Sequence, residues 1–248
     1  MIVAELTKLR RSSLWIIAAV LPVLAVVTGT VNYGNNQGML SSGWVPFWSQ
    51  VVLFYGMLFM SMGVAVLASA AWRMEHRGHN WNLLLTTPAH PSTITGVKIV
   101  ALIAMVAVMQ AVLLVLVFLL GTFFLGLDGP LPWEQGAVSL LAVVAAMPVV
   151  ALQSLLSMLT RSFVAPVALG LLGCAIGVGV LLGGGGGMLS YLVPQSLVTS
   201  ALFLGNSAVS DSAGLDVSVV VGIVFAAVAL TGVLWALSAA LLTRREAH

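Results

Sequence analysis

Charged side chains are scarce in this chain: Asp, Glu, Lys and Arg make up 6% of its 248 residues. Soluble domains contain about 25% of such residues, and a chain with so few cannot surround an apolar core with a solvated surface. The hydrophobic fraction is 60% and the mean hydropathy is +1.14. These values exclude an ordinary soluble protein and predict a protein whose exterior is mostly covered by lipid.

Cysteine is nearly absent as well, since Cys174 is the only one. A single cysteine cannot form an internal disulfide, so no disulfide framework indicates an oxidising compartment. We expect Cys174 to be a small buried side chain. Near the N-terminus, Lys8, Arg10 and Arg11 precede an apolar run and imitate a signal peptide. The run continues to Val31 without an obvious cleavage site, so we interpret it as a retained signal anchor.

A nucleotide-binding loop is missing too. Such a loop needs glycines followed by Lys and then Ser or Thr, but the only two lysines, Lys8 and Lys98, follow Thr7 and Val97. The glycine run at 183–187 has no lysine after it, and we interpret it as a flexible break. We therefore expect this chain to hold no cofactor and no catalytic residue of its own.

What the chain does contain is long apolar runs. A helix needs about 20 predominantly apolar residues to cross the hydrocarbon core of a bilayer. Six segments meet this requirement: 14–31, 45–71, 97–127, 137–159, 164–182 and 217–242. The predicted fold class is therefore all-α, a polytopic membrane protein with six transmembrane helices in one transmembrane domain over residues 1–248.

The distribution of charge predicts the orientation, because cytoplasmic loops of membrane proteins contain an excess of Lys and Arg. With the N-terminus inside, the cytoplasmic segments hold all nine basic residues: Lys8, Arg10, Arg11, Arg73, Arg77, Lys98, Arg161, Arg244 and Arg245. The outer loops then contain Asp128, Glu134, Asp211 and Asp216. We expect both termini in the cytoplasm of a bacterial cell and the spans in its plasma (inner) membrane.

Polar side chains inside the spans are few, and they include Gln50, Tyr55, Gln110, Gln153, Ser154 and Ser157. These residues are candidates for a substrate path, and hydrogen bonds between packed helices explain each of them as well. No Asp, Glu, His, Lys or Arg lies near the middle of a span. This absence disfavours an ion-coupled mechanism, because proton relays and ion-driven carriers usually place such groups inside the bundle.

The longest polar interruption of the first half is WRMEHRGHNWNLLLTTPAHPSTITGVK, residues 72–98. Asn80 is expected to cap a short helix within 76–91, on which Trp81, Leu84 and Leu85 share one face and which Pro88 ends. A two-turn helix cannot bury such a face alone. The pattern therefore predicts a helix that contacts a partner or, alternatively, one that lies on the lipid surface.

A metal site in this loop is an alternative, since His76 and His79 lie three residues apart and His90 follows. Zinc sites of the His-Glu-x-x-His type place the glutamate between the histidines, whereas Glu75 precedes both. We therefore expect no metal. Residues 1–12 are expected to form an amphipathic elbow helix at the inner interface.

The order of these features resembles the membrane subunits of type-2 ABC exporters, in particular the six-span permeases of the lantibiotic and bacitracin immunity group. The matching features are ELTKLRRSSLW at the start, RMEHRGHNWNLLLTTPAHPSTITGVK after the second span and LLTRREAH at the end. The resemblance implies an ABC-2 (type V exporter-like) architecture. It also implies that the loop after the second span is a coupling helix, which transmits motion from a separate ATPase subunit.

Carried over to this chain, the resemblance places six residues against the ATPase: Glu75, Asn80, Trp81, Leu84, Leu85 and Pro88. ATP and Mg would be bound by that partner. A second permease, identical or a sister chain, is implied as well, and residues 183–216 would form an outer segment that is re-entrant or interfacial. Gly173 and Gly177 are spaced for a close helix contact, either within the chain or between two permeases.

The leading hypothesis is that this chain is the transmembrane permease subunit of an ATP-driven exporter of amphipathic or lipophilic cargo, with peptide antibiotics as one candidate class. A gradient-driven carrier or channel acting alone is the alternative from another class. An intramembrane enzyme is disfavoured, because all four His residues lie outside the spans. Besides the ATPase and the second permease, we expect membrane lipid as a partner and no nucleic acid.

Overall fold

The structure, a computed structural model, describes residues 5, 7, 8, 12, 14–77, 89–183, 187–204 and 216–246. All regular elements in these ranges are helices. Six helical segments are long and apolar enough to cross a membrane: Leu14–Asn35, Trp44–His76, Pro91–Phe124, Trp133–Leu159, Val164–Leu182 and Val217–Arg244. The predicted all-α fold class with six spans is therefore confirmed.

Two of the six spans are composite. The second consists of α3 (Trp44–Phe54), the π-helix η1 (Tyr55–Phe59) and α4 (Met60–His76). The third consists of α6 (Pro91–Leu119) and the π-helix η2 (Leu120–Phe124). The remaining spans are α2 (Leu14–Asn35), α7 (Trp133–Leu159), α8 (Val164–Leu182) and α11 (Val217–Glu246). Between α8 and α11 lie two short helices, α9 (Met188–Leu192) and α10 (Pro194–Phe203).

The helices around residues 72–98 extend further than hydropathy indicates. α4 continues to His76, and α6 begins at Pro91 rather than at residue 97. Proline suits the first position of a helix because its missing N–H needs no partner there, and the His90 side chain caps this end by accepting a hydrogen bond from the Ser92 N–H. The two ends of the predicted 76–91 segment therefore belong to the flanking spans. Residues 78–88 lie outside the described part of the chain.

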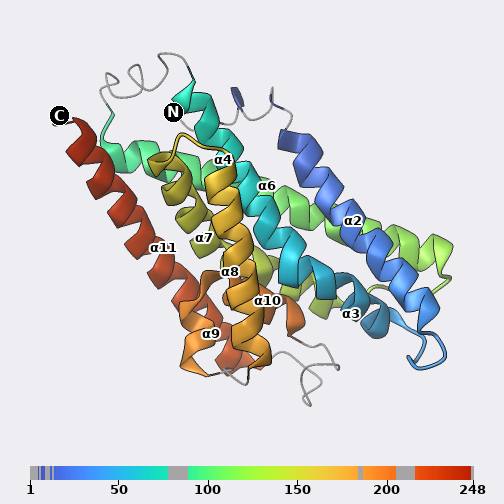
Figure 1. Cartoon of the computed structure of the whole chain (residues 1–248). Coiled ribbons are helices and arrows are strands. Elements are labelled where there is room, and N and C mark those ends of the chain that lie inside the picture. The colour runs from blue at the N-terminus through green and yellow to red at the C-terminus, as the bar shows by residue number, and fades with distance from the viewer. Residues whose placement is uncertain are drawn as a thin grey trace.

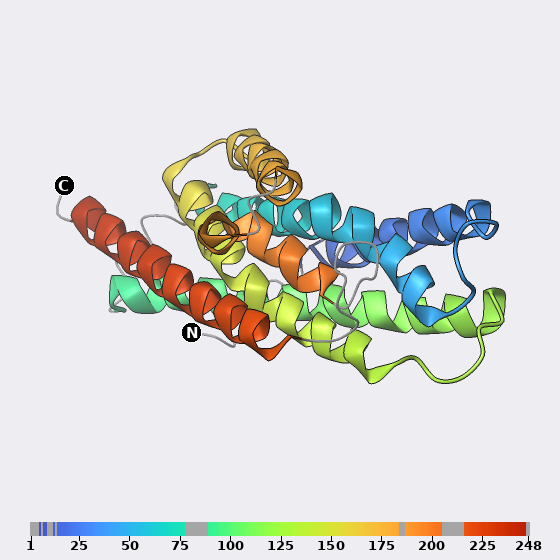
Figure 2. The ribbon, with the colours of Figure 1, turned by 90° about the horizontal axis from the view of Figure 1, so that it is seen from below.

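The centre of the bundle is formed by α7 and by the second span. α7 packs against α4, α6, α10 and α11, and 72% of its most apolar stretch is buried within the chain. The corresponding buried share is 22% for α8 and 17% for α11, so these two helices lie at the periphery. Figure 1 shows α11 along the left edge of the bundle and α8 in front of the other spans, and Figure 2 shows α11 crossing the outside of the bundle.

Helix α10 lies inside the bundle rather than across its end. Its first residue is Pro194, and Leu197, Val198, Ala201 and Leu202 are all fully buried. It packs against α7 and α8, and Figure 2 shows it among the spans. A helix of 10 residues is too short to cross the hydrocarbon core.

The glycines Gly173 and Gly177 face α10 of the same chain. A Cβ atom on Gly177 would lie 2.9 Å from the Ser196 backbone nitrogen, and one on Gly173 would overlap the amide group of Gln195. The small residues therefore let α8 and α10 approach closely. Of the two explanations left open for this spacing, the structure shows packing within the chain.

The described charges separate toward the two ends of the bundle. We call the end at which α4 finishes, α6 begins and α11 finishes the basic end (Figure 1). Trp235 of α11 donates a hydrogen bond to the Ser92 carbonyl of α6 there. The connections at the opposite, acidic end contain Asp128 and Asp216. Which end faces the cytoplasm stays a prediction from the charge pattern.

Candidate functional site

Four charged side chains at the basic end form one ionic cluster: Glu5, Lys8, Glu75 and Lys98. The Lys98 ammonium nitrogen lies 2.9 Å from Glu75 Oε1 and 3.1 Å from Glu5 Oε2. The Lys8 nitrogen lies 3.0 Å from Glu75 Oε1 and 3.0 Å from Glu5 Oε1. Each lysine therefore binds both carboxylates, and the cluster joins the N-terminal segment to the end of α4 and the beginning of α6.

The centre of the ionic cluster is removed from solvent. The side chains of Lys98 and Glu75 are 3% and 4% exposed, whereas that of Lys8 is 45% exposed. Burying a charge is costly unless an opposite charge and hydrogen bonds compensate for the lost water. Two ammonium groups and two carboxylates give the cluster zero net charge. Displacing any one member would leave a buried charge without its full set of partners.

Lys8 is the most exposed of the four members of the cluster, and its pKa reflects both its partial burial and its two carboxylate partners. Partial burial disfavours its charged form, but the hydrogen bonds to the carboxylates of Glu5 and Glu75 outweigh this effect and raise the pKa of Lys8 above its ordinary value. Lys8 is therefore charged at any physiological pH. The link from the N-terminal segment to α4 does not depend on pH in that range.

The ionic cluster continues into the centre of the bundle through Trp72. The Lys98 nitrogen lies 5.0 Å from the centre of the Trp72 ring, within the range of a cation–π interaction. The indole N–H of Trp72 donates a hydrogen bond of 2.7 Å to the Ser154 hydroxyl of α7. Trp72 is 1% exposed and packs in an apolar cluster with Ile94, Leu155 and other residues. α4, α6 and α7 are thus connected at one side chain.

Further contacts attach the last turns of α4 to α7 and to the turn before α8. His76 Nε2 lies 3.0 Å from the Ser157 carbonyl oxygen, and since a carbonyl only accepts, this nitrogen carries the proton. The Ser69 hydroxyl donates to the Phe163 carbonyl at 2.7 Å. The Arg73 guanidinium lies 5.6 Å from the centre of the Phe163 ring. A movement of the end of α4 would therefore displace both α7 and the turn before α8.

Most of the residues predicted to face an ATPase lie outside the described residues: Asn80, Trp81, Leu84, Leu85 and Pro88. Glu75 is among the described residues, and its contact with an ATPase stays a prediction. Its carboxylate is buried and bonded to Lys8 and Lys98. Glu75 therefore holds the base of the loop together in this structure, and a partner that touches it would have to compete with both lysines.

Sequence reasoning did not find the other members of the ionic cluster. It counted Lys98 with the polar segment 72–98, at the edge of the predicted span 97–127, whereas Lys98 is the eighth residue of α6. One signal was available, because both lysines of the chain are in the cluster while the other seven basic residues are arginines. Lysine is a compact point charge whose several hydrogen-bond donors suit a position between two carboxylates.

The polar residues predicted to line a substrate path do not gather in one place. Gln50 accepts a hydrogen bond from Asn32, Gln110 donates to Ser139 at 3.1 Å, and Ser154 accepts from Trp72. These are contacts between packed helices. Within this set, the buried groups that have no hydrogen-bond partner among the described residues are the Tyr55 hydroxyl, the Gln110 amide oxygen, the Gln153 amide and the Ser157 hydroxyl.

The π-helix in the second span is connected to α10. A π-helix disturbs the regular backbone hydrogen bonding of an α-helix, and such segments often occur at functional sites. The Thr199 hydroxyl of α10 lies 2.9 Å from the Gly56 carbonyl oxygen of η1 and donates to it. Gly56 also packs against the Leu202 side chain. The conformation of the second span is therefore tied to the position of α10.

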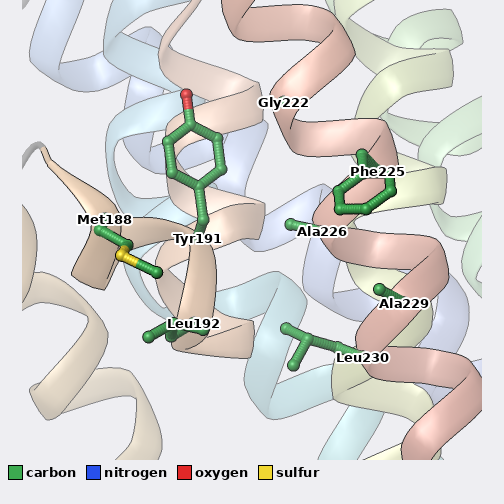
Figure 3. Close-up of a pocket in the computed structure, with 8 residues that line it drawn as sticks. All are labelled: Met188, Tyr191, Leu192, Gly222, Phe225, Ala226, Ala229 and Leu230. Atoms are coloured by element: carbon green, nitrogen blue, oxygen red, sulfur yellow. The ribbon is translucent and has the colours of Figure 1, made fainter.

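An apolar pocket of about 330 Å³ lies between α9 and α11. Figure 3 shows its lining: Met188, Tyr191, Leu192, Gly222, Phe225, Ala226, Ala229 and Leu230. The Tyr191 ring packs on Gly222, where a Cβ atom would lie 2.9 Å from the ring. The Tyr191 hydroxyl is the only side-chain hydrogen-bonding group among these eight residues. The pocket can accept an apolar chain, but it has few polar groups that could distinguish one apolar ligand from another.

Two of the three histidines weighed as metal ligands have other roles. His76 donates to the Ser157 carbonyl, and His90 caps α6, with its Nδ1 also 2.7 Å from the Ser92 hydroxyl. His79 lies outside the described residues.

Comparison with known proteins identifies the family of this chain. The family model for ABC-2 family transporter protein matches residues 1–177, which cover the first four spans and most of α8. A comparison with curated proteins finds no match. Members of the matched family are membrane components of transporters and normally work with an ABC ATPase as a separate subunit. The chain is thus a multi-pass membrane protein that belongs to the ABC-2 family of transporters.

Proposed function

We propose that this chain is the permease subunit of an ATP-driven exporter, with its basic end in the cytoplasm and a separate ATPase bound to the loop between α4 and α6. The observation that carries this proposal is the ionic cluster of Glu5, Lys8, Glu75 and Lys98. It connects both helices that flank the loop to the N-terminal segment. A force applied to the loop would therefore reach three parts of the chain at once.

The path of that force follows from the contacts. The end of α4 is attached to α7 through Trp72 and Ser154 and to the turn before α8 through Ser69 and Phe163. Packed helices respond to such displacements by moving between discrete arrangements. We propose that closure of the partner subunits on ATP shifts α4 and α6 together and switches the bundle between two states.

The first experiment tests the docking loop. The double variant Trp81→Ala/Leu84→Ala is co-expressed with candidate ABC ATPases, and retention of the ATPase is measured after affinity purification. We expect the loop variant to lose the ATPase. Met39→Ala is the matched control, because Met39 is an 85% exposed apolar side chain in the connection after α2, at the opposite end of the bundle. Retention of the ATPase by the loop variant, or equal loss by the control, would contradict the docking role.

The second experiment tests the orientation. In a Cys174→Ser background, single cysteines are introduced by Met39→Cys and Arg161→Cys, and intact cells are treated with a membrane-impermeant maleimide. We expect labelling at residue 39 and none at residue 161 until the cells are permeabilised. The opposite pattern would place the basic end outside and remove the proposed ATPase site from the cytoplasm.

The cargo proposal rests on the interior of the spans. The buried groups without a described partner include Tyr55 and Gln153, which are polar but uncharged at neutral pH. An interior with polar but uncharged groups suits amphipathic or lipophilic molecules, with peptide antibiotics as one class. We further propose that two permeases, identical or sister chains, assemble with two ATPases. Cells that contain the complete assembly should survive higher doses of membrane-active peptides than cells whose ATPase lacks its catalytic glutamate.

A further inference from the structure

A second pocket, of about 410 Å³, lies at the basic end between α2, α4 and the turn before α8. Its polar side includes Arg73 of α4 and Arg77, the residue that follows the end of α4. Its apolar side includes Leu14 and Ile17 of α2, together with Met74 and Phe163. Both kinds of surface therefore meet in one cavity next to the ends of three helices.

The two arginines are placed to act on one ligand. Arg73 lies in the last turn of α4, Arg77 is the first residue after this helix, and both line the pocket. Both are exposed, and the Arg73 guanidinium is held over the Phe163 ring at 5.6 Å. Glu75 lies between them in sequence but is buried in the ionic cluster, on a different side of the helix. Both arginines thus line the pocket, whereas Glu75 belongs to the cluster.

Within the described ranges, no carboxylate lies close enough to pair with these arginines. Among the described residues, neither Arg73 nor Arg77 forms an ion pair, and each ion pair found there involves Lys8 or Lys98. The chain has seven acidic residues, of which Glu5 and Glu75 are in the ionic cluster, Asp128, Glu134 and Asp216 lie in or next to the connections at the acidic end, and Asp211 lies outside the described residues. The seventh, Glu246, ends α11, which packs against α6 and α7. Because no carboxylate of the described residues pairs with either arginine, both are available to an anionic ligand.

We propose that this pocket binds an anionic phospholipid, with its phosphate between Arg73 and Arg77 and the start of an acyl chain against Leu14, Ile17 and Phe163. The guanidinium group matches phosphate oxygens with paired hydrogen bonds. Basic pockets between the ends of transmembrane helices suit anionic headgroups. The apolar wall favours a lipid over a free phosphate ion. This proposal does not depend on the partnership with an ATPase.

The test uses the full chain purified in detergent and native mass spectrometry after addition of phosphatidylglycerol or phosphatidylcholine. We expect the chain to retain phosphatidylglycerol about tenfold better than phosphatidylcholine. Arg73→Gln/Arg77→Gln should abolish this preference. Arg244→Gln/Arg245→Gln removes the same charge from the end of α11, and it should leave the preference intact. Equal losses in both variants would indicate general attraction to a basic surface and would overturn the proposal.

Two further arms identify the ligand class. Ile17→Trp reduces the space in the pocket without changing any charge, and it should lower phosphatidylglycerol retention even if the arginine variant fails to fold. Glycerol 3-phosphate and inorganic phosphate at the same concentrations should not displace the lipid. Displacement by either soluble anion, or undiminished retention in Ile17→Trp, would show that the acyl chain is not bound in this pocket and would overturn the proposal.

Discussion

Lys98 and Glu75 face each other across the base of a loop, with the ammonium nitrogen of one 2.9 Å from a carboxylate oxygen of the other. The two residues are 23 positions apart in sequence and lie on the two helices that flank residues 77–90. Their contact holds the end of α4 against the beginning of α6. This contact, and those between Trp72 and Ser154, between Thr199 and Gly56 and between Gly177 and Ser196, can each be tested by substitution.

The first prediction concerns the buried ion pair. Removing one partner of such a pair typically costs about 3–5 kcal/mol, because the other charge stays buried without compensation. We expect Lys98→Met to lower the midpoint of thermal unfolding in detergent strongly. The double variant Lys98→Met/Glu75→Met should lose less than the sum of the two single variants.

Lys8→Met serves as the control for position in the same cluster. The Lys8 side chain is 45% exposed, so its loss should cost only about 0–1 kcal/mol. Strictly additive losses for Lys98 and Glu75, or an equal effect of Lys8→Met, would show that the buried pair is not the main interaction.

The second prediction compares two serines of α7. Ser154→Ala removes the acceptor of the Trp72 indole N–H and should cost about 1–3 kcal/mol, since a buried donor is left unsatisfied. The Ser157 hydroxyl has no hydrogen-bond partner among the described residues, and the carbonyl that His76 uses is unchanged by substitution. Ser157→Ala should therefore be nearly neutral in the same thermal unfolding assay. A larger effect for Ser157→Ala would contradict this assignment.

The third prediction concerns the contact between α10 and the π-helix. Thr199→Val keeps the shape of the side chain but removes the hydroxyl that donates to the Gly56 carbonyl. We expect a loss of about 1 kcal/mol in stability, in line with a typical buried hydrogen bond. Thr199→Ser retains the hydroxyl and should restore most of the stability. Equal stability of the valine and serine variants would show that this hydrogen bond contributes little.

The fourth prediction compares two glycines of α8. A Cβ on Gly177 would lie 2.9 Å from the Ser196 backbone nitrogen, whereas a Cβ on Gly179 meets no atom within 4 Å. Gly177→Ala should therefore force α8 and α10 apart and cost about 1–3 kcal/mol. Gly179→Ala should be neutral or stabilise the helix by up to about 1 kcal/mol, because alanine has the higher helix propensity. The reverse order in thermal unfolding would place α10 elsewhere.

The sequence alone was sufficient to predict the six helices and the separation of charge. The physical reason is local, because a segment of about 20 apolar residues must span the hydrocarbon core whatever its neighbours are. The ends of the helices were less predictable. Pro91 and Ser92 are too polar for a span as judged by hydropathy, yet they form the first turn of α6.

Only the tertiary structure decided which side chains meet. Glu5 and Lys98 are 93 residues apart and form an ion pair, and Thr199 reaches Gly56 across 143 residues. Such contacts depend on the rotation of each helix about its axis and on the angles at which helices cross. Hydropathy does not specify these quantities for a helix that is apolar on every side. The sequence therefore determined that the chain has six spans. The packing of these spans decided which residues its two lysines, its α10 helix and the glycines of α8 contact.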